Sequence, residues 1–239
     1  MRLRRFRVER LPSEGGEVSL STAAAKHAAV LRLAVGDRIL LQDEAGHAAE
    51  ATITELSPKS LRCHAEAAID LPEPPALVLL LGPPKGSRLD DCVRAAVEVG
   101  ATAIHLLVTD RTVPSRESLA ARLDRLRRIA GEAARQSEQA WVTSVEGPST
   151  LREALTRAPR SAARICFDAR AEEPVPALPE GEAWIAVGPE GGFSEAEIDT
   201  LSRAGFRSAR LPTGVLRVET AVPVTLALAL AAQERSRRA

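Results

Sequence analysis

The chain has 239 residues, a length that accommodates one large or two small domains. Lysine and arginine together number 32, and so do aspartate and glutamate. The resulting net charge of zero excludes binding to nucleic acid through overall positive charge, but it allows local basic patches. With no tyrosine, four phenylalanines and two tryptophans, the chain has few aromatic side chains for a base-stacking platform.

The three cysteines are isolated, so the sequence predicts neither a disulfide framework nor a zinc ribbon. Isolated thiols are typical of a reducing compartment, and we expect a cytoplasmic protein. The first residues lack the apolar stretch of a signal peptide. The longest apolar run, at 221–232, is shorter than the roughly 20 residues that a membrane span needs. No metal-binding motif is visible, and we expect neither a metal nor a membrane partner.

Short apolar segments broken by glycine, proline and aspartate fill the first seventy residues, and one helix is predicted at 22–33. The strands predicted from these segments are 6–8, 17–20, 38–42, 50–55 and 60–64. Three prolines within residues 72–75 then stiffen the chain and end the last strand. We therefore predict a small β-barrel-like domain at residues 1–72 and a second domain at 73–239.

Continuous apolar runs alternate with helical patterns after residue 75. The runs predict buried strands at 76–81, 103–108, 164–167 and 183–187, followed by a short strand at 209–211. The helical patterns predict helices at 88–99, 115–139, 150–158, 194–204 and 219–234. Ser194 and Glu197 have the spacing of a capping box. This alternation predicts an α/β fold with a mainly parallel sheet.

The loop at 187–194 follows a predicted strand and precedes a capped helix, which is the place where open α/β sheets bind ligands. Its glycines allow a ligand to approach the backbone closely, and Glu190 places a charge in the middle of the loop. The spacing excludes a GxGxxG dinucleotide motif. A plain turn between strand and helix explains the loop equally well.

A second loop, at 211–221, carries Arg217, Glu219 and Thr220 into the last predicted helix. Its apolar residues suit an adenine slot in which backbone groups donate and accept hydrogen bonds. Capping of the helix by Glu219 and Thr220 is the alternative, although capping alone does not explain Arg217.

Basic residues gather in three further places. The segment 81–90 lacks the P-loop motif, but Lys85 and Arg88 either hold phosphate at a helix N-terminus or remain solvated. Arginines are concentrated at the N-terminus, and a second group of arginines begins at Arg111. Such segregated positive charge suits contact with an RNA backbone. A solvated helix face explains the Arg111 group equally well. The candidate RNA-binding residues are Arg2, Arg4, Arg5, Arg7, Lys85, Arg88 and Arg111.

Taken together, these segments resemble one family over nearly the whole chain, the bacterial 16S rRNA (uracil-N3)-methyltransferases of the SPOUT class. The matching segments are His27–Arg32, Gly36-Asp37, Lys85-Gly86, Glu98–Gly100, Thr109–Arg111, Gly188–Gly192 and Leu216–Ala221. The last two, in this order and spacing, are specific to the family. At the end of the long predicted helix, Arg135 and Gln139 stand where the family usually has an acidic residue and an arginine.

The resemblance implies a PUA-like N-terminal domain that grips RNA, a C-terminal domain with a deep trefoil knot, and a homodimer packed through the knot. It also implies S-adenosylmethionine (SAM) as the cofactor. The methylated atom would be N3 of one uridine in the 3′ part of 16S rRNA, at the decoding centre.

In such an enzyme, we expect Arg217 to stabilise negative charge on the uracil. Glu219 or Glu190 would accept the N3 proton or orient Arg217. The residues expected to hold SAM are Gly188, Pro189, Glu190, Gly191, Leu211, Pro212, Thr213, Val215, Leu216, Thr220 and Ala221.

Two other functions agree with the same residues. One is an RNA-binding protein of ribosome assembly without catalytic activity, for which the N-terminal domain alone would suffice. The other is a SPOUT methyltransferase that acts on another RNA or another base. Binding of SAM separates the first from the enzyme, and the identity of the methylated nucleoside separates the second.

Overall fold

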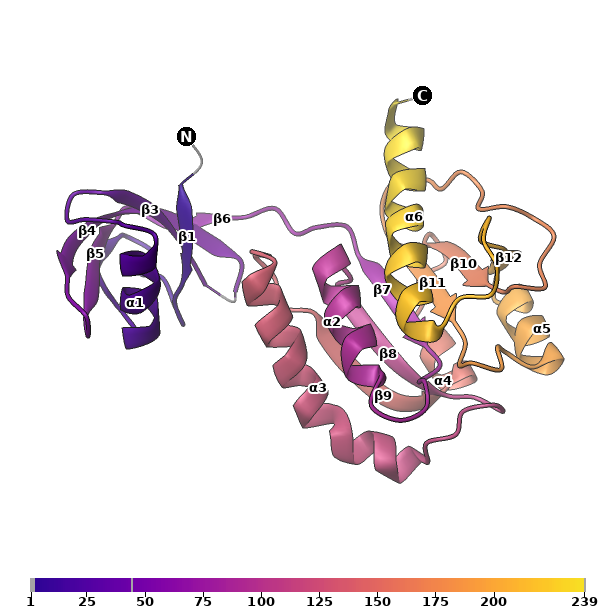
Figure 1. Ribbon diagram of the computed structural model, residues 1–239. Coiled ribbons are helices and arrows are strands. Elements are labelled where there is room, and N and C mark those ends of the chain that lie inside the picture. Colours follow the sequence, from indigo (N-terminus) through magenta and orange to yellow (C-terminus); the bar gives the residue numbers. More distant parts are fainter. Residues whose placement is uncertain (1–2, 44, 239) are drawn as a thin grey trace. The chain divides into compact units, whose positions relative to one another are not determined.

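The computed structural model describes residues 3–43 and 45–238, which form two compact units (Figure 1). The first unit comprises the chain up to Glu73 together with Glu138–Trp141, and the second comprises Pro74–Ser137 and the chain from Val142 onward. Within the described residues, no helix is both long enough and apolar enough to cross a membrane.

A six-stranded mixed sheet makes up most of the first unit, in the order β1-β3-β4-β5-β2 with β6 paired to β4. Its elements are β1 (Arg4–Arg7), β2 (Gly16–Leu20), α1 (Thr22–Val30), β3 (Arg38–Gln42), β4 (His47–Leu56), β5 (Leu61–Ala65) and β6 (Ile69–Asp70). β1 pairs with β3 in parallel, and the other neighbours are antiparallel. The five predicted strands and the predicted helix are present, and only the two-residue β6 was not predicted.

Alternation of side chains builds the core of this unit. In β5, Leu61, Cys63 and Ala65 are buried, whereas the side chains between them are exposed. The helix α1 begins at Thr22 because the Ser21 hydroxyl accepts a hydrogen bond from the Ala24 N–H at 3.2 Å. Sheet and helix therefore enclose one apolar core, which a short β-rich domain needs in order to fold.

The second unit contains a six-stranded sheet in the order β12-β10-β11-β7-β8-β9, and every neighbouring pair is parallel. Its strands are β7 (Leu77–Leu81), β8 (Ala103–Val108), β9 (Ser144–Thr150), β10 (Ala163–Phe167), β11 (Ala183–Val187) and β12 (Arg207–Ala209). Its helices are α2 (Leu89–Val99), α3 (Arg116–Gln136), α4 (Leu151–Leu155), α5 (Glu195–Arg203) and α6 (Val218–Arg238). The predicted α/β architecture with a parallel sheet is confirmed.

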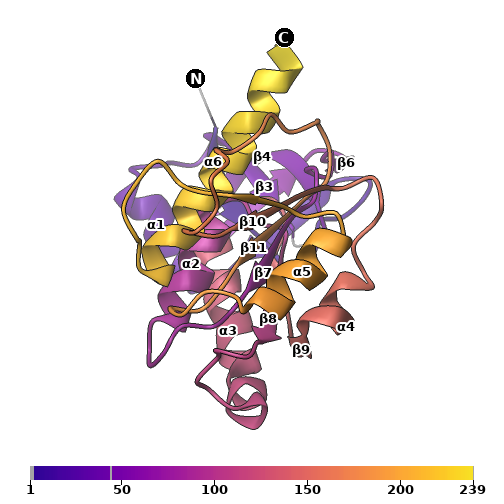
Figure 2. The same ribbon diagram turned by 90° about the vertical axis from the view of Figure 1, so that its right-hand side faces the viewer.

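Helices cover both faces of this sheet (Figure 2). Alternate residues of β7 pack into two different cores: Leu79 belongs to the core with α2, α3 and α6, and Leu80 belongs to the core with α4 and α5. All residues of β7 and β11 are buried, as their continuous apolar runs predict.

Two strands differ from the prediction. β9 was not predicted, because Gly147 and Pro148 interrupt its apolar pattern. The strand predicted at 209–211 lies two residues earlier in the structure. β12 ends at Ala209, which is buried, and the exposed Arg210 follows it. Arg210 and Leu211 therefore belong to the loop that follows β12.

His105 of β8 lies in the interior of this unit, with 5% of its surface exposed. Its ring stacks on Trp184, with centroids 5.5 Å apart, and its Nδ1 is 3.7 Å from the Glu146 carboxylate. Burial lowers the pKa of His105 below the ordinary histidine value; the Glu146 charge acts in the opposite direction and Arg157 in the same direction. Folding therefore favours the neutral form of this imidazole.

Because the unfolded chain binds this proton more readily, stability should fall as the pH drops below about 6.5, the value of a free histidine. We expect the free energy of unfolding, measured in urea at several pH values, to decline less steeply in His105→Phe than in the wild type. His64→Gln is the matched control, because the His64 side chain is 62% exposed. Equal slopes for the wild type and His105→Phe would contradict the prediction.

Candidate active site

A pocket of about 370 Å³ lies at the carboxyl ends of β10, β11 and β12. Three loops and the start of α6 line it, through Phe167–Arg170, Val187–Phe193, Arg210, Leu211, Thr213–Leu216, Val218, Ala221 and Thr225, together with Arg111. This edge of a parallel sheet is the usual ligand-binding place, and the volume suits a small molecule.

Glycines allow the backbone at the loop between β11 and α5 to pack closely. The Gly82 N–H donates to the Val187 carbonyl at 2.8 Å, and a Cβ on Gly82 would lie 2.4 Å from Cδ of Pro189. A Cβ on Gly188 would lie 2.9 Å from the carbonyl carbon of Gly192. Only glycine allows these backbone approaches, and so the sequence Gly188–Gly192 shapes this wall of the pocket.

Side chains after β8 and at the start of α5 hold the same loop. Arg111 Nη1 donates to the Gly191 carbonyl at 2.5 Å. The Glu197 carboxylate accepts hydrogen bonds from the N–H groups of Ser194 and Asp110, at 2.8 and 2.9 Å. The Ser194 hydroxyl accepts the Glu197 N–H, which confirms the predicted capping box.

The segment 82–88 contacts both candidate glutamates. The Lys85 backbone N–H donates to Glu190 Oε1 at 2.9 Å, and Arg88 Nε lies 3.3 Å from Glu219 Oε1. The structure thus pairs Glu219 with Arg88 rather than with Arg217. The second carboxylate oxygen of Glu219 is buried and accepts no hydrogen bond from the described residues.

Arg217 lies immediately before α6 with an exposed side chain. Its carbonyl accepts the Ala221 N–H at 2.8 Å, so its backbone belongs to the first turn of the helix. No described residue forms a hydrogen bond or ion pair with its guanidinium. The charge of Arg217 is therefore available to a ligand beside the pocket.

Asp168 and Arg170 line the pocket, and sequence reasoning missed both. Their side chains form an ion pair at 2.8 Å, and Arg170 Nη2 also donates to the Phe193 carbonyl at 2.9 Å. Burial acts to raise the pKa of Asp168, but hydrogen bonds and charge from Arg170 outweigh it and lower that pKa. The available signal was the position of Asp168, directly after a predicted buried strand.

The structure brings most of the predicted SAM-binding residues together. Those that line the pocket are Gly188, Pro189, Glu190, Gly191, Leu211, Thr213, Val215, Leu216 and Ala221. Pro212 and Thr220 are in the same loop and helix but do not line the pocket. Of the predicted catalytic residues, Glu190 lines the pocket. Arg217 and Glu219 do not line it, but they are the two sequence neighbours of Val218, which does.

The candidate RNA-binding residues have different surroundings. Arg2 lies outside the described residues, and Arg4 and Lys85 are exposed. Within the first unit, Arg5 Nη1 donates to the Glu138 carbonyl at 2.8 Å, and Arg7 donates to the Gln139 carbonyl. Arg111 contacts the Gly191 carbonyl in the wall of the pocket, and Arg88 contacts Glu219 in the first turn of α6.

Comparison with known proteins identifies the family. Residues 72–230 match the family described as "RNA methyltransferase domain", and residues 20–66 match "RNA methyltransferase PUA domain". A Synechocystis protein named "Ribosomal RNA small subunit methyltransferase E" is 33% identical over 230 residues, which cover 88% of this chain and 71% of that protein. The chain belongs to the ribosomal RNA small subunit methyltransferase E family.

Other members of the methyltransferase E family agree with this assignment. A Mycobacterium bovis protein of the same name is 29% identical over 234 residues, covering 92% of this chain and 88% of that protein. A crystal structure of the Neisseria gonorrhoeae methyltransferase E bound to SAM has a TM-score of 0.77 and 28% identity, and covers 96% of this chain and 97% of that one. The predicted family and the predicted PUA-like domain are confirmed.

Proposed function

We propose that this chain transfers the methyl group of SAM to N3 of one uridine in the 3′ part of 16S rRNA, at the decoding centre, which gives 3-methyluridine. The observation that carries the proposal is the pocket between the loop Gly188–Gly192 and the segment Leu216–Ala221. Both segments have the sequences that distinguish the family, and a relative with the same fold binds SAM.

The residues of the pocket fit SAM. The backbone of Gly188 and Gly191 is accessible because these residues carry no side chain, and Leu211, Val215 and Leu216 supply apolar surface for an adenine. The ion pair of Asp168 and Arg170 supplies charged groups in the pocket wall for the polar parts of the molecule. When bound, SAM supplies an electrophilic methyl group on its sulfonium.

The protein must make N3 of uracil nucleophilic, because N3 carries a proton and is a poor nucleophile in that form. The exposed Arg217 guanidinium stabilises negative charge on a uracil carbonyl oxygen as the proton leaves. Glu190 is the favoured proton acceptor, because it is exposed and lines the pocket. Glu219 is held by Arg88 and keeps its remaining oxygen buried, which favours an orienting role.

The remaining parts of the proposal concern the RNA and the assembly. The target base leaves the RNA stack before it reaches the pocket, and arginines of the first domain hold phosphates. In this proposal, the domains are residues 1–72 and 73–239, the second contains the trefoil knot, and two copies form a dimer through it. The enzyme acts in the cytoplasm on 16S rRNA or the small subunit.

A methylation assay tests the proposal. The protein and SAM are incubated with small subunits that lack the modification, and the digested RNA is analysed by mass spectrometry. We expect 3-methyluridine. A different methylated nucleoside would overturn the choice of base, and absence of both methylation and SAM binding would favour the RNA-binding protein without catalysis.

A further inference from the structure

The segment 82–88 contacts the glycine loop and the first turn of α6; its residues 82–84 are buried, but residues 85–87 have little to hold them in place. It binds Glu190 through the Lys85 N–H and Glu219 through the Arg88 side chain. Between these two contacts, residues 85–87 are exposed, so apolar burial contributes little to their conformation. Polar contacts must therefore fix this part of the segment.

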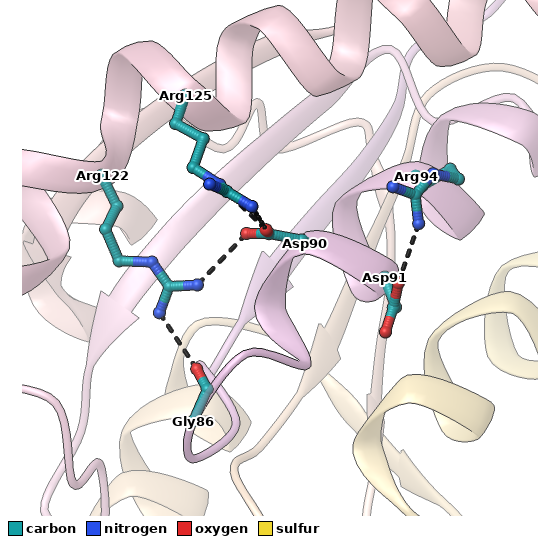
Figure 3. Close-up of polar contacts among 6 residues, drawn as sticks. All are labelled: Gly86, Asp90, Asp91, Arg94, Arg122 and Arg125. Atoms are coloured by element: carbon teal, nitrogen blue, oxygen red, sulfur yellow. Dashed lines mark hydrogen bonds and ion pairs between the residues drawn. The ribbon is translucent and has the colours of Figure 1, made fainter.

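Two arginines of α3 bind the same carboxylate at the start of α2, that of Asp90 (Figure 3). Arg125 donates from Nε and Nη2 to Asp90 Oδ2 at 3.0 and 2.6 Å, and Arg122 Nη2 donates to Oδ1 at 3.1 Å. At these two positions of α3, the arginines thus form ion pairs within the domain. Asp90 is largely buried, which strengthens its contacts with both guanidinium groups.

Arg122 differs from Arg125 in one further contact. Its Nη1 donates to the Gly86 carbonyl at 3.1 Å, in the middle of the exposed segment (Figure 3). The Arg122 side chain is 25% exposed and that of Arg125 is 64% exposed. One planar guanidinium therefore joins Asp90 of α2 to Gly86, next to the Lys85 N–H that binds Glu190.

We propose that Arg122 is a positioning residue for the active site. By holding the Gly86 carbonyl at a fixed place relative to Asp90, it keeps the Lys85 N–H against Glu190 and keeps Arg88 against Glu219. A lysine cannot replace it, because a single ammonium group lacks the two separated donors that span the two acceptors. The effect on methyl transfer rests on the proposed function, whereas the effect on the segment does not.

Hydrogen exchange at the Lys85 amide, followed by NMR on the protein without SAM or RNA, tests the structural part. Arg122→Gln and Arg125→Gln are matched variants, since each removes one positive charge beside Asp90. We expect exchange at Lys85 to become about tenfold faster in Arg122→Gln and to stay unchanged in Arg125→Gln. Arg122→Lys, which keeps the charge, should exchange as Arg122→Gln does, and it replaces that variant if Arg122→Gln does not fold.

Turnover tests the functional part. With saturating SAM and small subunits, kcat should fall about tenfold in Arg122→Gln and in Arg122→Lys, and should change less than about twofold in Arg125→Gln. Equal exchange in the two glutamine variants, or wild-type exchange in Arg122→Lys, would overturn the proposal. A wild-type enzyme that methylates no uridine would overturn the proposed function instead, and the exchange experiment would still decide the role of Arg122.

Discussion

Replacing Arg217 with alanine is expected to lower kcat for methyl transfer by about a hundredfold while the affinity for SAM stays near that of the wild type. The reason is the placement of the side chain: it is exposed beside the pocket and does not line it. Its charge is therefore useful to the uracil as negative charge develops, and it contributes little to holding the cofactor. Single-turnover kinetics and calorimetric titration with SAM measure the two quantities separately.

Two further variants make this result specific. Arg203→Ala removes an exposed arginine of α5 that pairs with Asp199, and it should leave kcat unchanged. Arg217→Lys keeps a positive charge and should recover part of the lost rate, because a single ammonium still interacts with a carbonyl oxygen. Full kcat in Arg217→Ala would rule out a role for this residue in the reaction.

The second large effect is expected at Gly82, which does not line the pocket. In Gly82→Ala, the new methyl group would lie 2.4 Å from Cδ and 2.6 Å from the nitrogen of Pro189. The glycine loop would have to move away, and we expect a loss of about 1–3 kcal/mol in the free energy of unfolding. Since Pro189 and Gly188 line the pocket, the affinity for SAM should fall as well. Urea denaturation and calorimetric titration measure both changes.

Gly131→Ala is the matched control for this substitution. Gly131 lies within α3, and among the described residues a Cβ there would meet only the flexible end of Arg135, at 3.7 Å. Alanine favours the helix, so this variant should be more stable by about 0.5–1 kcal/mol. If Gly82→Ala matched the wild type in stability and SAM affinity, the close packing of Gly82 on Pro189 would not matter for the site.

The sequence predicts the parallel sheet well because its central strands have one simple property. The runs at Leu77–Leu81 and Ala183–Val187 are apolar throughout, and burial on both faces of a sheet is what such runs favour. Prediction from the local pattern fails where a strand contains residues of low strand propensity, such as Gly147 and Pro148 in β9. It also fails for β12, which has three residues and so almost no pattern.

The same limit applies to the candidate site. The two ligand loops were predicted because glycines and charged residues follow apolar runs, which is a local signal. The partners of the charged residues are not local: Glu219 pairs with Arg88 and Glu190 accepts the Lys85 N–H, across more than half of the second unit's sequence. Arg170 was missed in part for the same reason: its partner Asp168 is two residues away, but its other partner, the Phe193 carbonyl, follows a different strand.

The strand order of the second unit also bears on how the protein is made. All six strands of the first sheet lie within Arg4–Asp70, so this sheet can form early in translation. β7 emerges next, but one of its edges pairs with β11, at Ala183–Val187, which the ribosome delivers much later. Until then a fully apolar strand has an open edge, a state that favours aggregation. We therefore expect the yield of soluble protein to depend on how fast the stretch between these two strands is translated and on chaperones that cover β7 meanwhile.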